Sequence, residues 1–181
     1  LPNKSLNFPE ESPEIPTIES IVKFSMEGSY PVSEGYLADI GVEDHSITTD
    51  MDNTDAHGGA HPYLISKMEP PEDRLQYNGK TFETLMSYSK RASPIHCEIL
   101  NLRAPCKTVI CTYNHQPRLF VAMRNANGDY IRTLTVDELK QIQGFPADFH
   151  LYGNLKQKII QIGNAVPPPL ITKVAKALIH S

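Results

Sequence analysis

Cysteine is scarce in this sequence of 181 residues, and the few thiols form no familiar pattern. An odd set of three cysteines argues against the disulfide framework of a secreted protein. Together with the seven histidines they give none of the paired spacings of a zinc site, so no metal is expected. We therefore expect reduced thiols and an intracellular protein.

Long apolar runs are also missing. No stretch approaches the roughly 18 apolar residues that span a bilayer. The N-terminus lacks the basic-then-apolar pattern of a signal peptide. We therefore expect no membrane partner. A composition of 40% hydrophobic and 21% charged residues excludes wholesale disorder and predicts one globular domain, or a small domain with an appendage that packs elsewhere.

Charge is divided unevenly along the chain. Residues 1–73 carry 3 Lys and Arg against 15 Asp and Glu, whereas residues 74–181 carry 14 against 6. This asymmetry favours a polyanion as the partner of the later part, with the first part facing solvent or a basic surface. A chance clustering of solvated charges is the alternative.

Local signals divide the chain into an extended start, a β-rich centre and a helical end. Residues 1–16 are rich in proline and predict an exposed linker, Thr17 is expected to cap a short helix, and residues 39–62 predict a long loop. Short apolar runs predict strands, and a turn at residues 127–129 predicts a hairpin. The runs are Ile95–Leu102, Thr108–Tyr113 and Leu119–Met123.

Two helices are expected near the C-terminus. Thr135 and Glu138 have the spacing of a capping box, and Gly144 and Pro146 would end the helix that follows. The last helix is expected over residues 168–179, where Leu170, Val174 and Leu178 form an apolar stripe.

Two motifs in the last fifty residues point to one family. The first runs from Arg132 through Leu134 and Thr135 to Glu138 and then to Gln143-Gly144-Phe145-Pro146; the second is Gly163-Asn164-Ala165-Val166. In order and separation they resemble the Arg-x-Leu-Thr…Glu…Gln-Gly-Phe-Pro and Gly-Asn-[Ser/Ala]-Val elements of DNA cytosine-5 methyltransferases. Ile160 stands where that family often has a polar or basic residue.

The resemblance implies an α+β fold. A small β-rich target-recognition domain would be followed by C-terminal helices that pack on a separate Rossmann-like methyltransferase domain. It further implies a linker over residues 1–20, target recognition over 21–146 and a closing element over 147–181. The first motif and Gly163 would then be framework residues. Asn164, Ala165 and Val166 would lie beside S-adenosylmethionine, which is bound mainly by the large domain. A turn or helix-entry role is the alternative for Asn164.

The segment ahead of these motifs corresponds to target recognition in that family. Thr108 and Val109 fit its Thr-[Leu/Ile/Val] pair, and basic and polar residues surround them. Such a surface suits phosphate contacts and major-groove reading of double-stranded DNA, with a solvated basic face as the alternative. The expected DNA-binding residues are Lys90, Arg91, Arg103, Lys107, Thr108, Val109, Gln116 and Arg118.

The family's catalytic elements are absent. Methyl transfer to cytosine carbon 5 needs a thiolate, a carboxylic acid and a Gly-rich cofactor loop, which the family places in Pro-Cys, Glu-Asn-Val and strand-to-helix elements ahead of target recognition. Pro105-Cys106 lies directly before the Thr-Val pair, so Cys106 is interpreted as a structural cysteine and no residue of this chain as catalytic.

The sequence therefore predicts the recognition part of a two-part methyltransferase, inactive alone and completed by a catalytic polypeptide. Its start with Leu and its proline-rich opening resemble the linker that follows the family's large-domain strand. Two alternatives remain: a catalytically inactive, methyltransferase-derived DNA-binding or regulatory protein, and an interaction module that holds a basic protein through its acidic first part.

Overall fold

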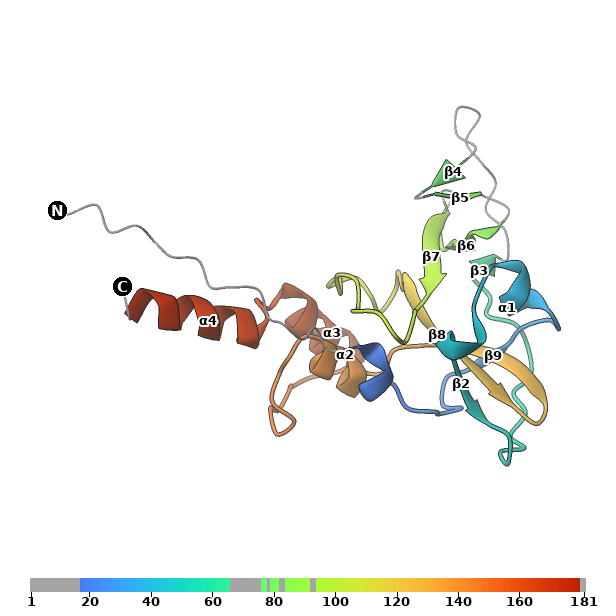
Figure 1. The fold of residues 1–181 in the computed structure, drawn as a ribbon, viewed down its shortest axis with the longest axis horizontal. Coiled ribbons are helices and arrows are strands. Elements are labelled where there is room, and N and C mark those ends of the chain that lie inside the picture. The colour runs from blue at the N-terminus through green and yellow to red at the C-terminus, as the bar shows by residue number, and fades with distance from the viewer. Residues whose placement is uncertain (1–16, 66–75, 78, 82–83, 92–93, 180–181) are drawn as a thin grey trace.

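A curled β-sheet with helices extending from one end organises the chain in the computed structural model (Figure 1). The structure describes residues 17–65, 76–77, 79–81, 84–91 and 94–179. The strands are β1 (Tyr30–Pro31), β2 (Ile47–Asp50), β3 (Leu64–Ile65), β4 (Gln76–Tyr77), β5 (Lys80–Thr81), β6 (Met86–Tyr88), β7 (Ile95–Ile99), β8 (Leu119–Asn125) and β9 (Gly128–Thr133). The helices are α1 (Tyr36–Asp39), α2 (Val136–Ile142), α3 (Leu155–Asn164) and α4 (Pro168–Ile179), with 3-10 turns η1 (Ile18–Ser20) and η2 (Asp44–Ser46).

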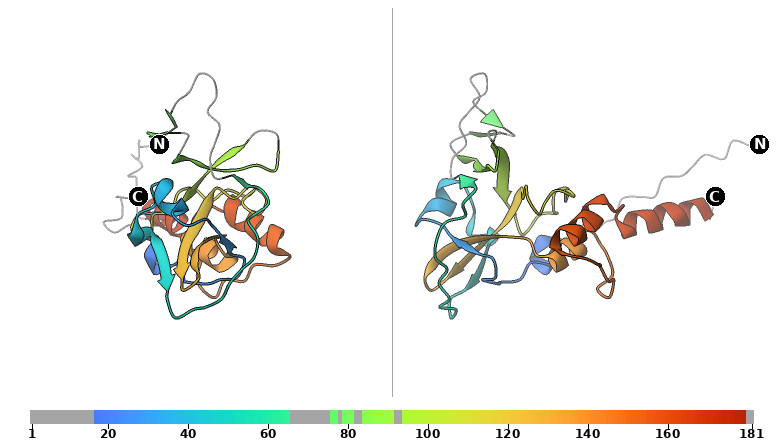
Figure 2. Two further views of the ribbon diagram at one scale, coloured as in Figure 1. Left: turned by 90° about the vertical axis from the view of Figure 1, so that its right-hand side faces the viewer. Right: turned by 180° about the vertical axis from the view of Figure 1, so that it is seen from behind.

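Strand β8 is the centre of the sheet. The strand order of the sheet is β1-β9-β8-β7-β6-β3. Strand β2 pairs with the same edge of β8 as β7 does, but farther along β8. Both β2 and β7 run parallel to β8, whereas β9 pairs with it antiparallel. Because two strands share one edge in succession, the sheet turns away from a flat layer, as Figures 1 and 2 show. Strands β4 and β5 form a separate two-stranded ladder.

The hairpin of β8 and β9 confirms the predicted strand pair, with its turn placed slightly earlier than expected. Asn125 pairs with Gly128, so the connection consists of Ala126 and Asn127 rather than residues 127–129. Gly128 has φ 135°, a conformation that L side chains rarely adopt. Asp129 is already in the strand and accepts a hydrogen bond from Arg124 at 2.6 Å.

Two apolar clusters pack against the sheet. One contains Val121, Met123, Leu139 and Ile162, so it joins the sheet to α2 and α3; the other contains Tyr36, Phe120, Ala122 and Ile131 beneath α1. Consecutive residues of β8 alternate between the two clusters because strand side chains point to opposite faces. Since both faces are covered, nearly the whole of β8 is buried.

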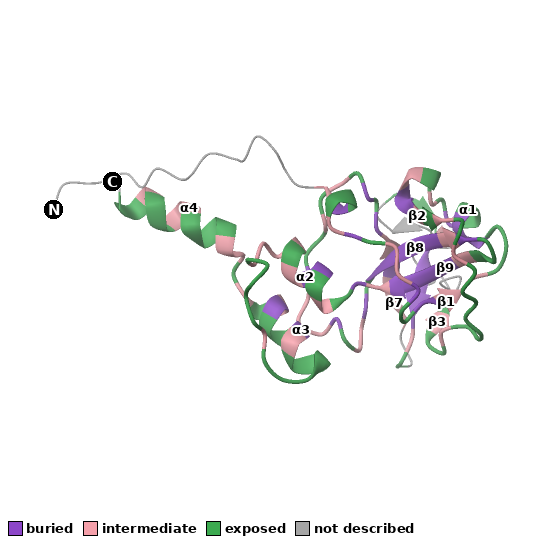
Figure 3. Cartoon of the chain, turned by 90° about the horizontal axis from the view of Figure 1, so that it is seen from below, coloured by how far each residue is buried: buried purple, intermediate pink, exposed green. Residues whose placement is uncertain are grey.

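Helices α2 and α4 begin and end where local signals predicted, whereas α3 was not expected. The capping box at the start of α2 is present, with Thr135 accepting from the Glu138 backbone N–H and the Glu138 carboxylate accepting from the Thr135 N–H. Gly144, with φ 81°, ends that helix, and α4 spans the residues expected. Helix α4 extends away from the sheet and buries none of its residues (Figures 2 and 3).

Three sequence-based expectations need correction. Residues 39–62 contain η2 and β2, so they are not simply a long loop. Residues 108–113 form no strand, although Val109 and Tyr113 are buried in the core. Thr17 precedes only the 3-10 turn η1 and makes no side-chain cap. The predicted linker over residues 1–16 lies outside the described residues.

Candidate nucleic-acid interface

The two sequence motifs meet at the junction of the C-terminal helices. The side-chain amide of Gln143 donates hydrogen bonds to the carbonyl oxygens of Ala165 (2.9 Å) and Ile162 (3.3 Å), so it satisfies groups that helix α3 leaves open at its end. Gly144 lies against the ring of Pro169 at the start of α4, where an added Cβ would come within 2.7 Å of ring carbons. Gln143 and Gly144 of the first motif thus fix the path of the segment that follows the second motif, from the end of α3 to the start of α4.

Gly163 has a different role from the tight turn expected of it. It lies inside α3, one residue before the end of the helix. A Cβ at this position would lie 2.4 Å from the backbone nitrogen of Cys111 and 2.7 Å from the carbonyl carbon of Ile110. The glycine therefore lets α3 contact the backbone that follows the Thr108-Val109 pair. The other framework residues, Phe145 and Pro146, lie beyond the end of α2, and the Phe145 ring lies 4.9 Å from that of Phe149.

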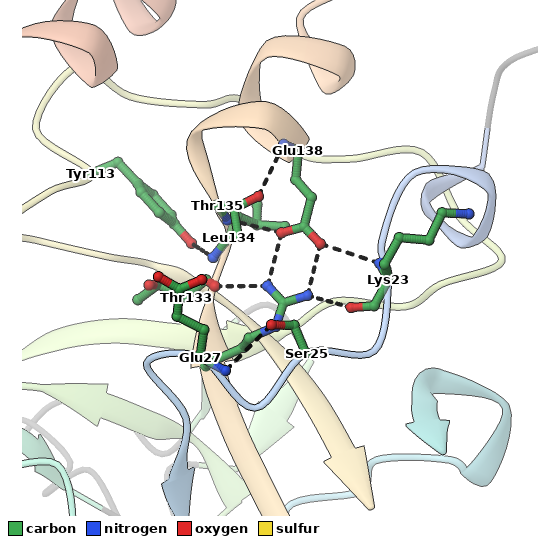
Figure 4. A network of polar contacts seen from close by, with 9 residues as sticks. Lys23, Ser25, Glu27, Tyr113, Thr133, Leu134, Thr135 and Glu138 are labelled. Carbon is green, nitrogen blue, oxygen red and sulfur yellow. Dashed lines mark hydrogen bonds and ion pairs between the residues drawn. The ribbon is translucent and has the colours of Figure 1, made fainter. Parts of the chain in front are cut away.

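A buried ion pair joins the first motif to the start of the described chain (Figure 4). The Arg132 guanidinium, 1% exposed, donates to both carboxylate oxygens of Glu138 at 2.7 and 2.8 Å. It also donates to the carbonyl oxygens of Lys23 (2.6 Å) and Thr133 (3.0 Å). The Lys23 N–H donates back to Glu138 at 3.3 Å. This network holds residue 23, the end of β9 and α2 in one arrangement.

The charge of Glu138 is stabilised by that network. Burial by itself raises the pKa of Glu138, but the hydrogen bonds from Arg132 and from the Thr135 backbone outweigh burial and leave the pKa below its usual value. Beside the pair, the buried Tyr113 hydroxyl donates to the Leu119 carbonyl at 2.6 Å and accepts from the Leu134 N–H at 2.8 Å. Tyr113 thus ties the segment after Thr108 to the ends of β8 and β9.

Three of the eight expected DNA-binding residues line one cleft. Lys107, Thr108 and Arg118 surround a hollow of about 460 Å³ together with His96 and Glu98. Lys107 and Arg118 are exposed, and the Lys107 ammonium lies 2.7 Å from Glu98. Burial lowers the pKa of His96, the Glu98 carboxylate opposes this effect, and nearby Lys107 adds to it. The cleft therefore combines two exposed cations, one of them paired with the Glu98 carboxylate, with the Thr108 hydroxyl, which can donate to an anion.

The other five expected residues are more scattered. Arg103 is exposed in the turn after β7, and Gln116 is half-buried in the turn before β8. Lys90 and Arg91 are exposed after β6, where the Lys90 ammonium lies 5.1 Å from the centre of the Tyr63 ring. Val109 is only 5% exposed and packs in the core, so it fixes the position of Thr108 rather than presenting its own side chain.

Burial raises the pKa of two of the three thiols. Burial raises the pKa of the Cys106 thiol to about 11, and the Glu98 carboxylate adds to the rise. Burial also raises the pKa of Cys97 to about 12, and its thiol contacts the Pro117 carbonyl oxygen at 3.2 Å. A covalent catalyst needs a thiolate near neutral pH, which calls for a lowered pKa. Within the described residues, no group of three or more His, Cys, Asp or Glu side chains is arranged to hold a metal.

The residues expected beside the cofactor lie at the outer end of α3. Asn164 is the last residue of the helix, and both Asn164 and Val166 are exposed, the latter by 57%. Ala165 is half-buried, and its carbonyl oxygen accepts a hydrogen bond from Gln143. An exposed amide beside an apolar side chain could form one wall of a site for a cofactor that has both polar and apolar parts. These three residues do not by themselves enclose such a site.

An aromatic cluster was not found from the sequence. The rings of Tyr30, His61, Tyr63 and Tyr88 come together from β1, the segment before β3, and β6. Their separation in sequence hides the cluster. The one available signal was Tyr88 two residues before Lys90, because an aromatic next to a cation is typical of nucleic-acid surfaces.

Comparison with known proteins places these features in context. The family model of the C-5 cytosine-specific DNA methylases matches residues 1–180. Type II methyltransferase M.MspI of Moraxella sp is 36% identical over 78 residues, 43% of this chain and 19% of that protein. DNA (cytosine-5)-methyltransferase 3 of Arabidopsis thaliana is 41% identical over 68 residues, 38% of this chain and 5% of that protein.

A third relative matches over a longer stretch. Type II methyltransferase M.AplI of Arthrospira platensis is 30% identical over 113 residues, 58% of this chain and 28% of that protein. The matched parts thus span less than a third of each of these relatives. No solved structure matches the chain. Among the described residues, no helix is long and apolar enough to cross a membrane.

Proposed function

Because the chain belongs to the C-5 cytosine-specific DNA methylase family, we propose that it is the DNA-recognition part of a cytosine-5 methyltransferase. The catalytic Pro-Cys element and most of the S-adenosylmethionine site would come from a partner polypeptide, and the two would form a heterodimer. One observation carries this two-part proposal: the closing helix α4 extends from the fold with its apolar side chains uncovered.

The apolar surface of α4 is large enough to anchor a partner. Leu170 and Ile171 are 50% and 52% exposed, and Ile179 is 78% exposed. Fully burying a Leu or Ile side chain contributes about 1.5–3 kcal/mol, so covering these three exposed fractions would contribute roughly 3–5 kcal/mol. The large domain of the same enzyme is the proposed cover, since the motif preceding α4 resembles the family's closing element.

The cysteines support a catalytic centre elsewhere. A nucleophilic thiol at Cys106 would have to ionise against both its burial and the Glu98 carboxylate. Without a partner the chain would therefore be inactive. S-adenosylmethionine, when bound, supplies the methyl group. Asn164, Ala165 and Val166 would form one side of its site, with the Asn164 amide donating or accepting a hydrogen bond and Val166 excluding water.

The cleft around Lys107 and Arg118 is the proposed contact with double-stranded DNA. Exposed Lys and Arg side chains bind phosphates and release counterions, so affinity should fall steeply with salt. Thr108, held by buried Val109, lies at the same cleft and could approach a base edge. The Lys107–Glu98 ion pair would open when Lys107 turns to a phosphate, since Lys107 is largely exposed.

Reconstitution tests the proposal. The chain would be co-expressed with a candidate polypeptide carrying Pro-Cys and Glu-Asn-Val elements, and co-purification and methyl transfer to duplex DNA would be measured. A chain ending at Ala165 keeps the Gln143 contacts with α3 but lacks α4, so it should still bind DNA and lose association. Lys176→Ala, an exposed polar change on α4, is the matched control and should leave association intact.

Two outcomes would redirect the assignment. If the chain binds duplex DNA but no catalytic polypeptide restores methyl transfer, it acts as a methyltransferase-derived DNA-binding protein. If binding to duplex DNA is absent even at low salt, the DNA-recognition proposal fails, and an interaction module is left. The double variant Lys107→Ala, Arg118→Ala should weaken binding and reduce the slope of log affinity against log salt by about 2.

A further inference from the structure

Four rings form a packed cluster where the curl of the sheet brings β1, at one end of the strand order, close to β3 and β6 at the other. The His61 ring centre lies 4.5 Å from that of Tyr30, 5.5 Å from Tyr88 and 6.0 Å from Tyr63. Tyr63 and Tyr88 are in edge contact at 5.8 Å. The Tyr63 carbonyl accepts a hydrogen bond from the Ser89 N–H at 2.7 Å, so the segment that carries Tyr63 is fixed to the end of β6. The rings therefore have a defined arrangement.

The rings of the cluster differ in solvent exposure, from a buried inner ring to a partly exposed one at the rim. Tyr88 is 4% exposed and belongs to the core, whereas Tyr63 is 37% exposed. Tyr30, His61 and Tyr88 also border a hollow of about 480 Å³. A ring held from behind but open in front is suited to stacking.

A cation lies over the open ring. The Lys90 ammonium lies 5.1 Å from the centre of the Tyr63 ring, and Lys90 is exposed. Burial lowers the pKa of His61, which favours the neutral form of this ring. An aromatic face with a cation at its border matches a nucleotide, which presents a flat base beside an anionic phosphate.

We propose that Tyr63, supported by His61 and Tyr88, is a stacking platform for an unpaired nucleobase of the bound DNA. Lys90, a flexible side chain, would move from the Tyr63 ring to the phosphate next to that base. Stacking on an aromatic ring tolerates any base because every base has a π face, so the platform would detect an unstacked base rather than a sequence. The inference rests on the proposed DNA-recognition function and adds a second contact region to the cleft at Lys107.

Fluorescence of 2-aminopurine tests the platform. The unaltered chain would be titrated into two duplexes that differ only in whether a single 2-aminopurine is paired or unpaired. Stacking on Tyr63 should quench the unpaired probe and make that duplex bind about tenfold more tightly than the paired one. Tyr63→Ala should remove the quenching and the tenfold preference, whereas Tyr63→Phe, which keeps the ring, should retain both.

Two further variants separate ring from charge. Tyr152→Ala removes a tyrosine that is 78% exposed and lies before α3, so it should leave quenching unchanged. Lys90→Ala should reduce the slope of log affinity against log salt by about 0.9, the value for one phosphate contact. Because Tyr63 is at the rim, a circular-dichroism melt of Tyr63→Ala within a few degrees of the parent would establish that the fold is retained.

The results distinguish this inference from the function on which it rests. Salt-dependent binding of both duplexes with equal affinity and unquenched probe would overturn the platform while leaving DNA recognition intact. Absence of binding to either duplex would overturn both. Quenching that survives Tyr63→Ala would also overturn the platform, because the base would then be stacked elsewhere.

Discussion

Replacing Gly163 with alanine should separate α3 from the segment on which it packs. The new Cβ would lie 2.4 Å from the nitrogen and 2.5 Å from the Cα of Cys111, about 1 Å inside ordinary van der Waals contact. All the near atoms belong to the backbone, so no side chain can rotate away. Overpacking of this kind costs about 3 kcal/mol at the upper end of its usual range. Alanine returns up to about 1 kcal/mol through its higher helix propensity.

The expected net loss is therefore about 2 kcal/mol, or roughly 4–8 °C in Tm for a chain of this size. Urea unfolding followed by circular dichroism measures it. Gly58→Ala is the matched control, because Gly58 has open space around its Cβ position and no positive φ; its effect should stay within about 0.5 kcal/mol. A Gly163→Ala protein at least as stable as the parent would refute the close packing of α3 on Ile110 and Cys111.

Three further predictions follow from the buried pair, the thiol and the last helix. Glu138 has a folded-state pKa below its unfolded value of 4.5, so its stabilising contribution is complete above that pH and disappears as pH falls through the folded-state pKa. Glu138→Gln should cost about 3–5 kcal/mol at pH 7 and flatten the acid limb of a stability-against-pH curve. Cys106→Ser should leave reconstituted methyl transfer within a few-fold of the parent, and a loss of roughly 10³-fold with the fold intact would place the nucleophile in this chain. Leu170→Ser combined with Ile171→Ser should abolish co-purification with the catalytic polypeptide while leaving the Tm of the isolated chain nearly unchanged, because neither side chain is buried in it.

Signals confined to a few residues predicted structure well. The capping box at Thr135 and Glu138 is a contact between neighbours in sequence, and the period of the last helix is visible within residues 168–179. The hairpin strands were also recognisable, because turn-forming residues around Asn127 separate two apolar runs, although the connection itself is Ala126 and Asn127. In each case the stabilising contacts lie within one element or between two adjacent ones.

Features that depend on distant partners were missed. Strand β2 forms because Ile47–Asp50 finds the free edge of β8 some seventy residues later, which its polar sequence does not indicate. The apolar residues Val109 and Tyr113 suggested a strand, but their segment turns so that the Tyr113 hydroxyl can bridge two strand ends. Likewise Gly163 was expected in a tight turn. Its actual role is to let α3 approach backbone about fifty residues earlier in the chain, which the local sequence does not reveal.

Among the candidate site residues, Lys107, Thr108 and Arg118 lie at one cleft, whereas Lys90 lies beside the aromatic cluster. The sequence positions of these basic residues do not show which of them share a surface, because that depends on how β6, β7 and β8 are ordered in the sheet. Their contacts with DNA remain predictions.

Strand β1, an outer strand of the main sheet, has a consequence for behaviour at high concentration. It has only two residues, and Pro31 has no N–H to offer a neighbour. This edge gives another molecule little backbone with which to extend the sheet on that side, so strand-to-strand stacking there is disfavoured. Self-association of the isolated chain would instead favour the exposed apolar side chains of α4.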